Sequence, residues 1–271
     1  MMEFGSGTNG LPASLSLDTS TTNPISSAPF TLTALNTATS LTETVPTNYT
    51  LTSVECVDES STPVSTSLSG GTLTIDSSAV VGGADLTCTF TNTRKGAQVR
   101  LDKAWIDAVI GDQVTLGSTG GTNNPSLVAV ADTTNEVDGG TEVTVFAGET
   151  LSFSELFDVG DASNYTTTLE CTGSTDTDPS DGLDIVAADD GATVVCKYTD
   201  TGLPSINAVK SPGSVTGPTA AGIYTATYTV EVTNSGIAPT TYGPLVDVPA
   251  FDSNLTVTGA SWTTSGAGAP A

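Results

Sequence analysis

The chain has 271 residues, with 30 acidic side chains against 6 basic ones and no histidine, so its formal net charge is −24. A chain this acidic is repelled by nucleic acid and by anionic lipid headgroups, and we expect neither as a partner. The lack of histidine excludes Ser-His-Asp and Cys-His catalysis and histidine-ligated metal centres. No apolar run approaches the roughly 18 residues of a membrane-spanning helix. We therefore expect no enzyme activity, no cofactor and no membrane insertion.

The composition favours strands throughout the chain. Fifty threonines supply a β-branched side chain that suits pleated strands, and 28 glycines and 14 prolines supply frequent turns. The predicted fold class is all-β, with tandem immunoglobulin-like or prealbumin-like β-sandwich domains in an elongated chain. The opening MMEFGSGTNG has no apolar signal core, so we interpret residues 1–10 as a tag-like or arbitrary leader.

An internal repeat organises the next two hundred residues. Residues 41–56 and 153–171 share a glutamate after a short strand, an Asn-Tyr-Thr turn and a closing Glu-Cys pair. The segments LTCTFTNT (86–93) and VVCKYTDT (194–201) also match. We therefore predict one domain at 11–97 and a second at 98–202. The first is N-terminally incomplete, because it has no counterpart of the strand-like AQVRLDKAW that opens the second.

The third predicted domain, residues 203–271, has a different pattern and is interpreted as truncated. In YTATYTVEV, Tyr224, Ala226, Tyr228 and Val230 alternate with polar residues, which predicts a half-buried antiparallel strand before an Asn-Ser-Gly turn. Trp262 follows a second alternating segment. It could lie in the core or serve as a sugar-stacking surface, whereas Trp105 shares its strand face with apolar residues and is expected in the core.

The four cysteines follow the repeat, with two in each predicted domain. Four cysteines permit three connectivities, and the repeat selects the one that closes each domain on itself, Cys56 with Cys88 and Cys171 with Cys196. Free core thiols are the alternative, while zinc is disfavoured because there is no close C-x-x-C pair. Disulfides indicate an extracellular, secreted or cell-surface protein.

One acidic cluster could bind a cation. The segment DTDPSDGLD places Asp176, Asp178, Asp181 and Asp184 within nine residues, and clustered carboxylates suit Ca²⁺. The spacing misses the helix-loop calcium pattern, and the proline and the glycine of the segment are equally typical of a solvated hairpin loop. We therefore predict no metal site and keep these four as weak calcium candidates.

The repeated landmarks resemble the prealbumin-like, collagen-adhesin B-type repeats of bacterial surface proteins. They are Glu-x-x-Pro-x-x-Tyr-Thr-Leu-Thr before the first cysteine and Leu-Thr-Cys-Thr-Phe-Thr-Asn-Thr around the second. Residues 203–271 resemble an immunoglobulin-like conserved repeat of large surface proteins. The resemblance implies a structural stalk of an adhesin or surface fibre, with neighbouring domains of a longer surface protein as partners. The alternatives are a module that binds an extracellular ligand (a sugar, calcium or a host protein) and the accessory domains of a secreted hydrolase.

Strand alternation places three ionisable groups inside the second domain. Lys103 shares a face with Val99, Leu101 and Trp105, while Glu155 and Asp200 alternate with apolar residues on two other strands. Buried charges are costly unless they neutralise one another. We therefore expect either a buried ion pair or a spontaneous amide bond between Lys103 and Asp200, assisted by Glu155. The resemblance favours the amide, because these repeats join a first-strand lysine to a last-strand Asn or Asp beside a glutamate. The first domain has Glu43 and Asn92 at these places but no matching lysine.

Overall fold

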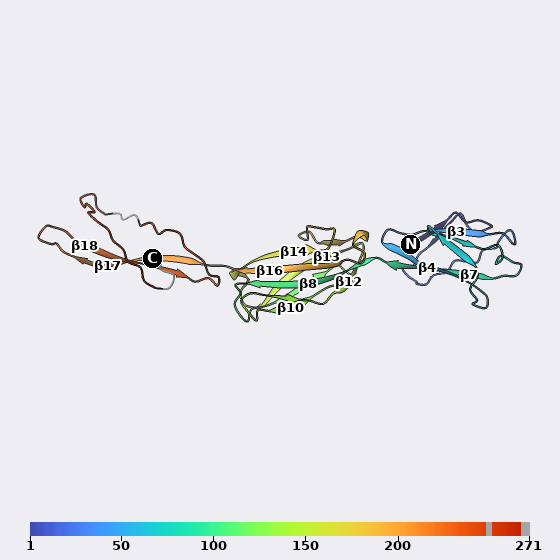
Figure 1. Ribbon diagram of the computed structural model, residues 1–271, viewed down its shortest axis with the longest axis horizontal. Helices are drawn as coiled ribbons and strands as arrows, with labels where there is room; N and C mark the ends of the chain where they lie inside the picture. Colours follow the sequence, from blue (N-terminus) through green and yellow to red (C-terminus); the bar gives the residue numbers. More distant parts are fainter. Residues whose placement is uncertain (248–250, 267–271) are drawn as a thin grey trace. The chain divides into compact units, whose positions relative to one another are not determined.

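The computed structural model describes residues 1–247 and 251–266, and they are almost entirely strands and loops (Figure 1). Residues 248–250 and 267–271 of the predicted third domain lie outside the described residues. Contacts divide the chain into two units, Met1–Pro239 and Thr240–Ala271. Within the described residues no helix is long and apolar enough to span a membrane. Ala162–Asn164 and Ala187–Asp189 form short 3-10 turns.

The first repeat is built from two antiparallel sheets. One sheet has the order β2-β1-β3-β6-β5, and the other contains β4 and β7. The strands are β1 (Met2–Gly5), β2 (Ser14–Leu17), β3 (Thr39–Thr44), β4 (Tyr49–Asp58), β5 (Thr66–Ser69), β6 (Thr72–Ile75) and β7 (Leu86–Arg94).

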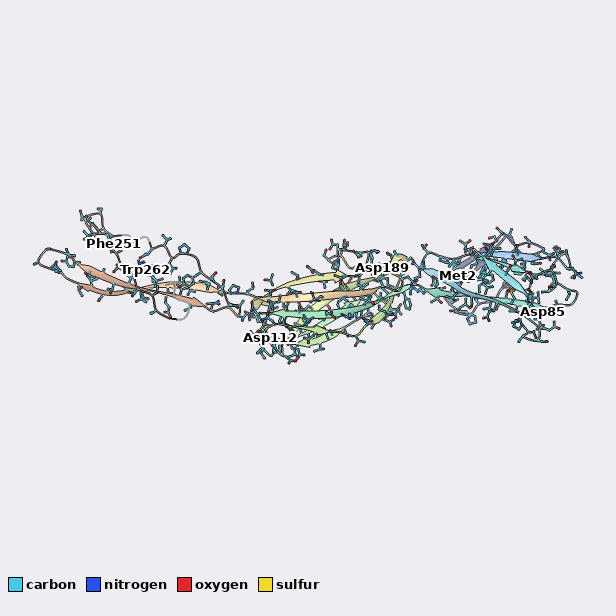
Figure 2. The ribbon with its side chains drawn as sticks, viewed as in Figure 1. Met2, Asp85, Asp112, Asp189, Phe251 and Trp262 are labelled. Carbon is cyan, nitrogen blue, oxygen red and sulfur yellow. A yellow bond between two sulfur atoms is a disulfide. The ribbon has the colours of Figure 1, made fainter. Side chains whose placement is uncertain are left out.

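The expectation that residues 1–10 form a leader was wrong. The structure places β1 between β2 and β3, and both Met2, which is labelled in Figure 2, and Phe4 are buried. The Phe4 ring packs edge-on against Phe90 at a centroid distance of 5.0 Å. Alternation over four residues is too short to stand out in a sequence, so β1 was missed.

The second repeat is a larger sandwich of nine strands. One sheet has the order β10-β9-β13-β15; the other has the order β11-β8-β16-β14, with β12 also paired to β8. The strands are β8 (Gly96–Ile106), β9 (Gln113–Thr119), β10 (Leu127–Val130), β11 (Glu136–Gly139), β12 (Val143–Phe146), β13 (Glu149–Val159), β14 (Tyr165–Thr172), β15 (Leu183–Ile185) and β16 (Thr193–Gly202).

The first and last strands of this repeat, β8 and β16, run parallel and side by side (Figure 1). Most of their inward side chains, with Trp105 at 1% exposure among them, belong to one apolar core. Trp105 therefore lies in the core as expected. This pairing brings residues that are about a hundred positions apart in the sequence into direct contact.

Several strands of the two repeats correspond. The pair β4–β7 corresponds to β14–β16, since Cys56 lies opposite Cys88 and Cys171 opposite Cys196. In the other sheet β3 corresponds to β13, because Glu43 lies opposite Phe4 of β1 as Glu155 lies opposite Leu116 of β9. Among the described residues, however, no strand of the first repeat corresponds to β8.

The following segment is a hairpin of β17 (Ile206–Thr216) and β18 (Thr225–Asn234). The predicted antiparallel strand is therefore present, but its apolar face is not half-buried, since Tyr228 is 46% exposed. The predicted turn follows, where Asn234 Oδ1 accepts hydrogen bonds from the backbone N–H groups of Ser205 and Gly236.

The second unit contains a turn in which the Leu255 N–H donates to the Asp252 carbonyl. Its Trp262 is 74% exposed (Figure 2), so the described residues do not enclose this ring in a core.

Candidate cross-link site

Three strands of the second repeat bring Lys103, Glu155 and Asp200 together. In the parallel register of β8 and β16, Lys103 lies opposite Tyr198 and Asp200 lies opposite Trp105. Because strand side chains alternate between faces, Lys103 and Asp200 both point into the sandwich, and both are 0% exposed. Glu155 approaches from β13 in the facing sheet, with a side chain 8% exposed. The structure therefore confirms the inward placement of Lys103, Glu155 and Asp200 that strand alternation predicted.

The amine of Lys103 touches both carboxyl groups. Its Nζ lies 2.6 Å from Glu155 Oε1, to which it donates a hydrogen bond, and 2.6 Å from Asp200 Oδ2. The other oxygen of Asp200, Oδ1, accepts a hydrogen bond of 2.6 Å from the Thr167 hydroxyl. Asp200 Oδ2 accepts no hydrogen bond from the described residues, so its contact with Nζ is a short approach without hydrogen-bond geometry. Thr167 thus orients the carboxyl while Glu155 holds the amine.

The surroundings of this cluster disfavour ionisation of Glu155. Burial raises the pKa of Glu155 above its ordinary value, and the charge of Asp200 adds to this, while Lys103 acts in the opposite direction. The Lys103 Nζ also lies 4.4 Å from the Trp105 ring centroid. One amine between two buried carboxyls leaves an excess negative charge that a proton on Glu155 removes. The arrangement therefore holds the Lys103 amine against the Asp200 carboxyl, with Glu155 beside the amine as an acid that can exchange a proton with it.

The cysteines form the two disulfides expected, Cys56–Cys88 and Cys171–Cys196. Each joins directly opposite residues of two antiparallel strands, β4 with β7 and β14 with β16. Cys196 lies on the same inward face of β16 as Asp200, four residues away. The second disulfide therefore fixes the strand that carries the carboxyl of the cross-link candidate.

Three of the four weak calcium candidates accept hydrogen bonds within or beside their own loop. Asp176 accepts hydrogen bonds from the backbone N–H groups of Asp178 and Asp184, and Asp178 accepts from the N–H and the hydroxyl of Ser180. Asp184 also accepts a hydrogen bond from the Thr150 hydroxyl. Across residues 1–247 and 251–266, no three or more side chains of His, Cys, Asp or Glu lie close enough together to hold a metal ion. Asp181 is therefore not part of such a group either.

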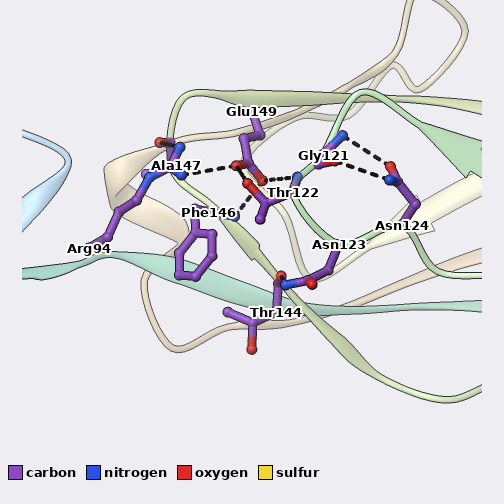
Figure 3. A network of polar contacts seen from close by, with 9 residues as sticks. All are labelled: Arg94, Gly121, Thr122, Asn123, Asn124, Thr144, Phe146, Ala147 and Glu149. Carbon is purple, nitrogen blue, oxygen red and sulfur yellow. Dashed lines mark hydrogen bonds and ion pairs between the residues drawn. The ribbon is translucent and has the colours of Figure 1, made fainter. Parts of the chain in front are cut away.

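A network of polar contacts surrounds Glu149 (Figure 3), and the sequence did not predict it. The Arg94 guanidinium donates 3.0 Å and 3.2 Å hydrogen bonds to Glu149 Oε1 and the Ala147 carbonyl, and stacks 4.8 Å from the Phe146 ring centroid. Burial opposes the charge of Glu149, but donors from Thr122, from the Phe146 N–H and from Arg94 lower its pKa below the ordinary value. Arg94 at the end of β7 and Glu149 at the start of β13 are 55 positions apart, and no spacing pattern in the sequence indicates that they meet.

A partial version of the site exists in the first repeat. Glu43 of β3 is 3% exposed, and its Oε1 accepts a 2.7 Å hydrogen bond from Asn92 Nδ2 on β7. Burial raises the pKa of Glu43, against the effect of the Asn92 hydrogen bond. No lysine of the described residues contacts this pair, as the sequence led us to expect.

Comparison with known families supports the resemblance. Residues 3–94 match the model of a family described as a prealbumin-like fold domain. The first repeat is a prealbumin-like domain. The match begins inside β1, which agrees with the structure in placing that strand within the domain. No curated protein and no solved structure matches the chain. The prealbumin-like pattern of two sheets is repeated, with an additional first strand, in the second repeat.

Proposed function

We propose that the chain is a structural stalk segment of an extracellular surface fibre or adhesin, whose second repeat is locked by an amide bond between Lys103 and Asp200. Prealbumin-like domains of this type are structural parts of multi-domain bacterial surface proteins. Two disulfides fit an oxidising, extracellular location. The partners in this proposal are neighbouring domains of the same longer protein.

The observation that carries the proposal is the position of the Lys103 amine. It lies 2.6 Å from a carboxyl oxygen of the last strand and 2.6 Å from Glu155 Oε1, with no exposure to solvent. Reacting groups held at van der Waals contact or closer gain a large effective concentration over the same groups in solution. Exclusion of water also favours amide formation over hydrolysis.

The reaction balances without any added reagent. A proton passes from the Lys103 ammonium to the Asp200 carboxylate, and the neutral Nζ then attacks Cγ. A C–N bond forms, and one Cγ–O bond breaks so that its oxygen leaves as water. Glu155 takes a proton from the amine and delivers one to the departing oxygen, which is the role of a general acid and base. Because burial raises its pKa, Glu155 holds the proton that the departing oxygen needs more readily than an exposed glutamate does. A cross-link of this kind joins the first strand to the last, so a pulling force along the chain could not separate β8 from β16.

A tryptic digest of the reduced protein tests the bond directly. Cleavage after Arg100, Lys197 and Lys210 leaves Asp200 in the peptide 198–210. We expect this peptide to remain attached to a peptide that starts at 101, because an acylated Lys103 is not a trypsin site. In Glu155→Gln the peptides 104–197 and 198–210 should appear separately, since the proton carrier is removed.

Glu170→Gln is the matched control for this digest, because Glu170 is an exposed glutamate on β14. It should give the same linked product as the wild type. A free 198–210 peptide from the folded wild-type protein would contradict the proposal.

A further inference from the structure

The two repeats are joined without a free linker. The strand β7 ends at Arg94 and β8 begins at Gly96, so a single residue, Lys95, lies between them. The Lys95 N–H donates a 2.9 Å hydrogen bond to the Asn48 carbonyl of the first repeat, and the Lys95 carbonyl accepts one of 2.9 Å from the Ala147 N–H of the second. Because a peptide unit is planar, each of these bonds fixes a whole unit. The backbone rotations left between the two fixed units are φ and ψ of Lys95.

The side chain of Arg94 crosses this junction. Arg94 is the last residue of β7, which belongs to the first repeat. Its guanidinium is directed into the second repeat, where it donates to Glu149 Oε1 and to the Ala147 carbonyl and lies over the Phe146 ring (Figure 3). A rotation at Lys95 would carry the guanidinium away from these partners, so the side chain resists the two backbone rotations that remain.

The carboxyl group that receives the arginine is itself held in place. Glu149 accepts hydrogen bonds from the N–H and the hydroxyl of Thr122 and from the Phe146 N–H, all within the second repeat. Its side chain is only 10% exposed. The donors of an arginine are fixed in a planar fork, and here they meet two acceptors that cannot move independently. The contact therefore defines a direction as well as a distance.

A second contact joins the turns on either side of the junction. Asn48 lies in the turn between β3 and β4, and Gly148 lies in the turn between β12 and β13. A methyl group built on Gly148 would lie 2.8 Å from Asn48 Nδ2, so these turns of the two repeats touch. Gly148 has φ +88°, a conformation that glycine adopts readily.

The distribution of charge gives the arginine a further role. Residues 1–93 carry acidic side chains and no basic one, and the second repeat is also net negative. Two acidic domains in contact repel each other, which favours separation of their facing ends. Arg94 and Lys95 place the first two basic side chains of the sequence at this junction, where they offset the repulsion.

We propose that the junction at Lys95 is a rigid joint, closed by Arg94, which makes the two repeats move as one body. Contacts already group both repeats in one unit, Met1–Pro239. In the proposed stalk such a joint would pass a bend or a twist of one repeat on to the next. The joint itself requires no amide bond between Lys103 and Asp200.

Residual dipolar couplings of the backbone amides test the rigidity in the full 271-residue chain. In a weakly aligning medium two domains that move as one body share one alignment tensor, so both repeats of the wild-type protein should give the same degree of order. In Arg94→Ala the two values should differ, because the repeats then reorient independently. Protected amides in β4 and β7 would show that the first repeat of this variant is still folded.

Arg100→Ala is the matched control for this measurement. Arg100 is a partly exposed arginine that pairs with two carboxyl groups, Asp102 and Glu142, but both of these lie in the second repeat. Its removal should therefore leave the two degrees of order equal.

Trypsin gives a second readout, because Arg94 and Lys95 are the first cleavage sites in the sequence. A protease needs the residues around the bond to open locally, and the joint opposes this opening. We expect cleavage after Lys95 to be about tenfold or more faster in Arg94→Ala than in the wild type, because a hydrogen bond to a charged group is lost. Arg94→Lys keeps the charge without the fork and should give an intermediate rate.

Unequal degrees of order in the wild-type protein would overturn the inference, whatever the variants show. Equal degrees of order in Arg94→Ala, with unchanged cleavage after Lys95, would also overturn it, since Arg94 would then not close the joint. Neither result would alter the mass of the protein, so a failure of the joint is distinguishable from a failure of the proposed cross-link.

Discussion

Replacing Lys103 by alanine is expected to give the largest loss of stability of any single substitution in the second repeat. The change leaves Glu155 and Asp200 buried with no cation, and both are close to fully inaccessible. Breaking a buried ion pair in this way costs about 3–5 kcal/mol, which lowers the unfolding temperature of a domain of this size by about 10–30 °C. Loss of the proposed cross-link would add to this effect.

Tryptophan fluorescence can follow the unfolding of this repeat selectively. Trp105 is buried beside Lys103, whereas Trp262 is already 74% exposed, so the signal change on heating reports on Trp105. Lys197→Ala is the control, because Lys197 is an exposed lysine on β16 and its loss should change the free energy of unfolding by less than about 0.5 kcal/mol. Equal unfolding temperatures for Lys103→Ala and Lys197→Ala would show that the buried cluster contributes nothing to stability.

Removing the Cys56–Cys88 disulfide is expected to unfold the first repeat at 37 °C. The bond closes a separation of 32 residues in a repeat whose central apolar cluster has four buried members, with Cys56 among them. The chain-entropy model assigns such a loop about 3–4 kcal/mol, and small domains often fail to fold without it. In the Cys56→Ala/Cys88→Ala variant, amide hydrogens of β4 and β7 should exchange at the rate of an unfolded chain.

The matched variant is Cys171→Ala/Cys196→Ala in the second repeat. The separation of 25 residues implies a similar loss, but this repeat has a core that extends over both sheets. It should therefore remain folded, with protected amides in β14 and β16 and a lowered unfolding temperature. If the amide hydrogens of the first repeat stayed protected in the variant without its disulfide, the expectation that this bond is needed for folding at 37 °C would be wrong.

Much of the fold could be predicted because its signals are repeated or strictly periodic. The matching segments around Cys88 and Cys196 predicted two related domains and the pairing of the cysteines within each. Alternation over many residues identified the strands that carry Lys103 and Asp200 and the direction in which they point. Period-two patterns fix which face a side chain occupies, and a buried face strongly specifies the register.

Other features could not be predicted because their signals are short or non-local. The buried strand Met2–Gly5 is too brief for a periodic pattern, and the contact between Arg94 and Glu149 joins residues that are 55 positions apart. The alternation of Tyr224 to Val230 predicted a strand correctly but not its surroundings, since alternation describes two unlike faces and not what covers them. The short approach of Nζ to Asp200 Oδ2 also depends on the parallel pairing of β8 with β16.

The intact mass of the folded protein, measured before and after reduction, tests the proposed amide most directly. With the bond, the unreduced protein should lack four hydrogens for its two disulfides and about 18 Da for the expelled water, and only the hydrogens should return on reduction. Asp200→Asn should reach the same final mass as the wild type, because its side-chain amide releases ammonia and leaves an identical product. A wild-type mass that lacks the four hydrogens alone would contradict the cross-link.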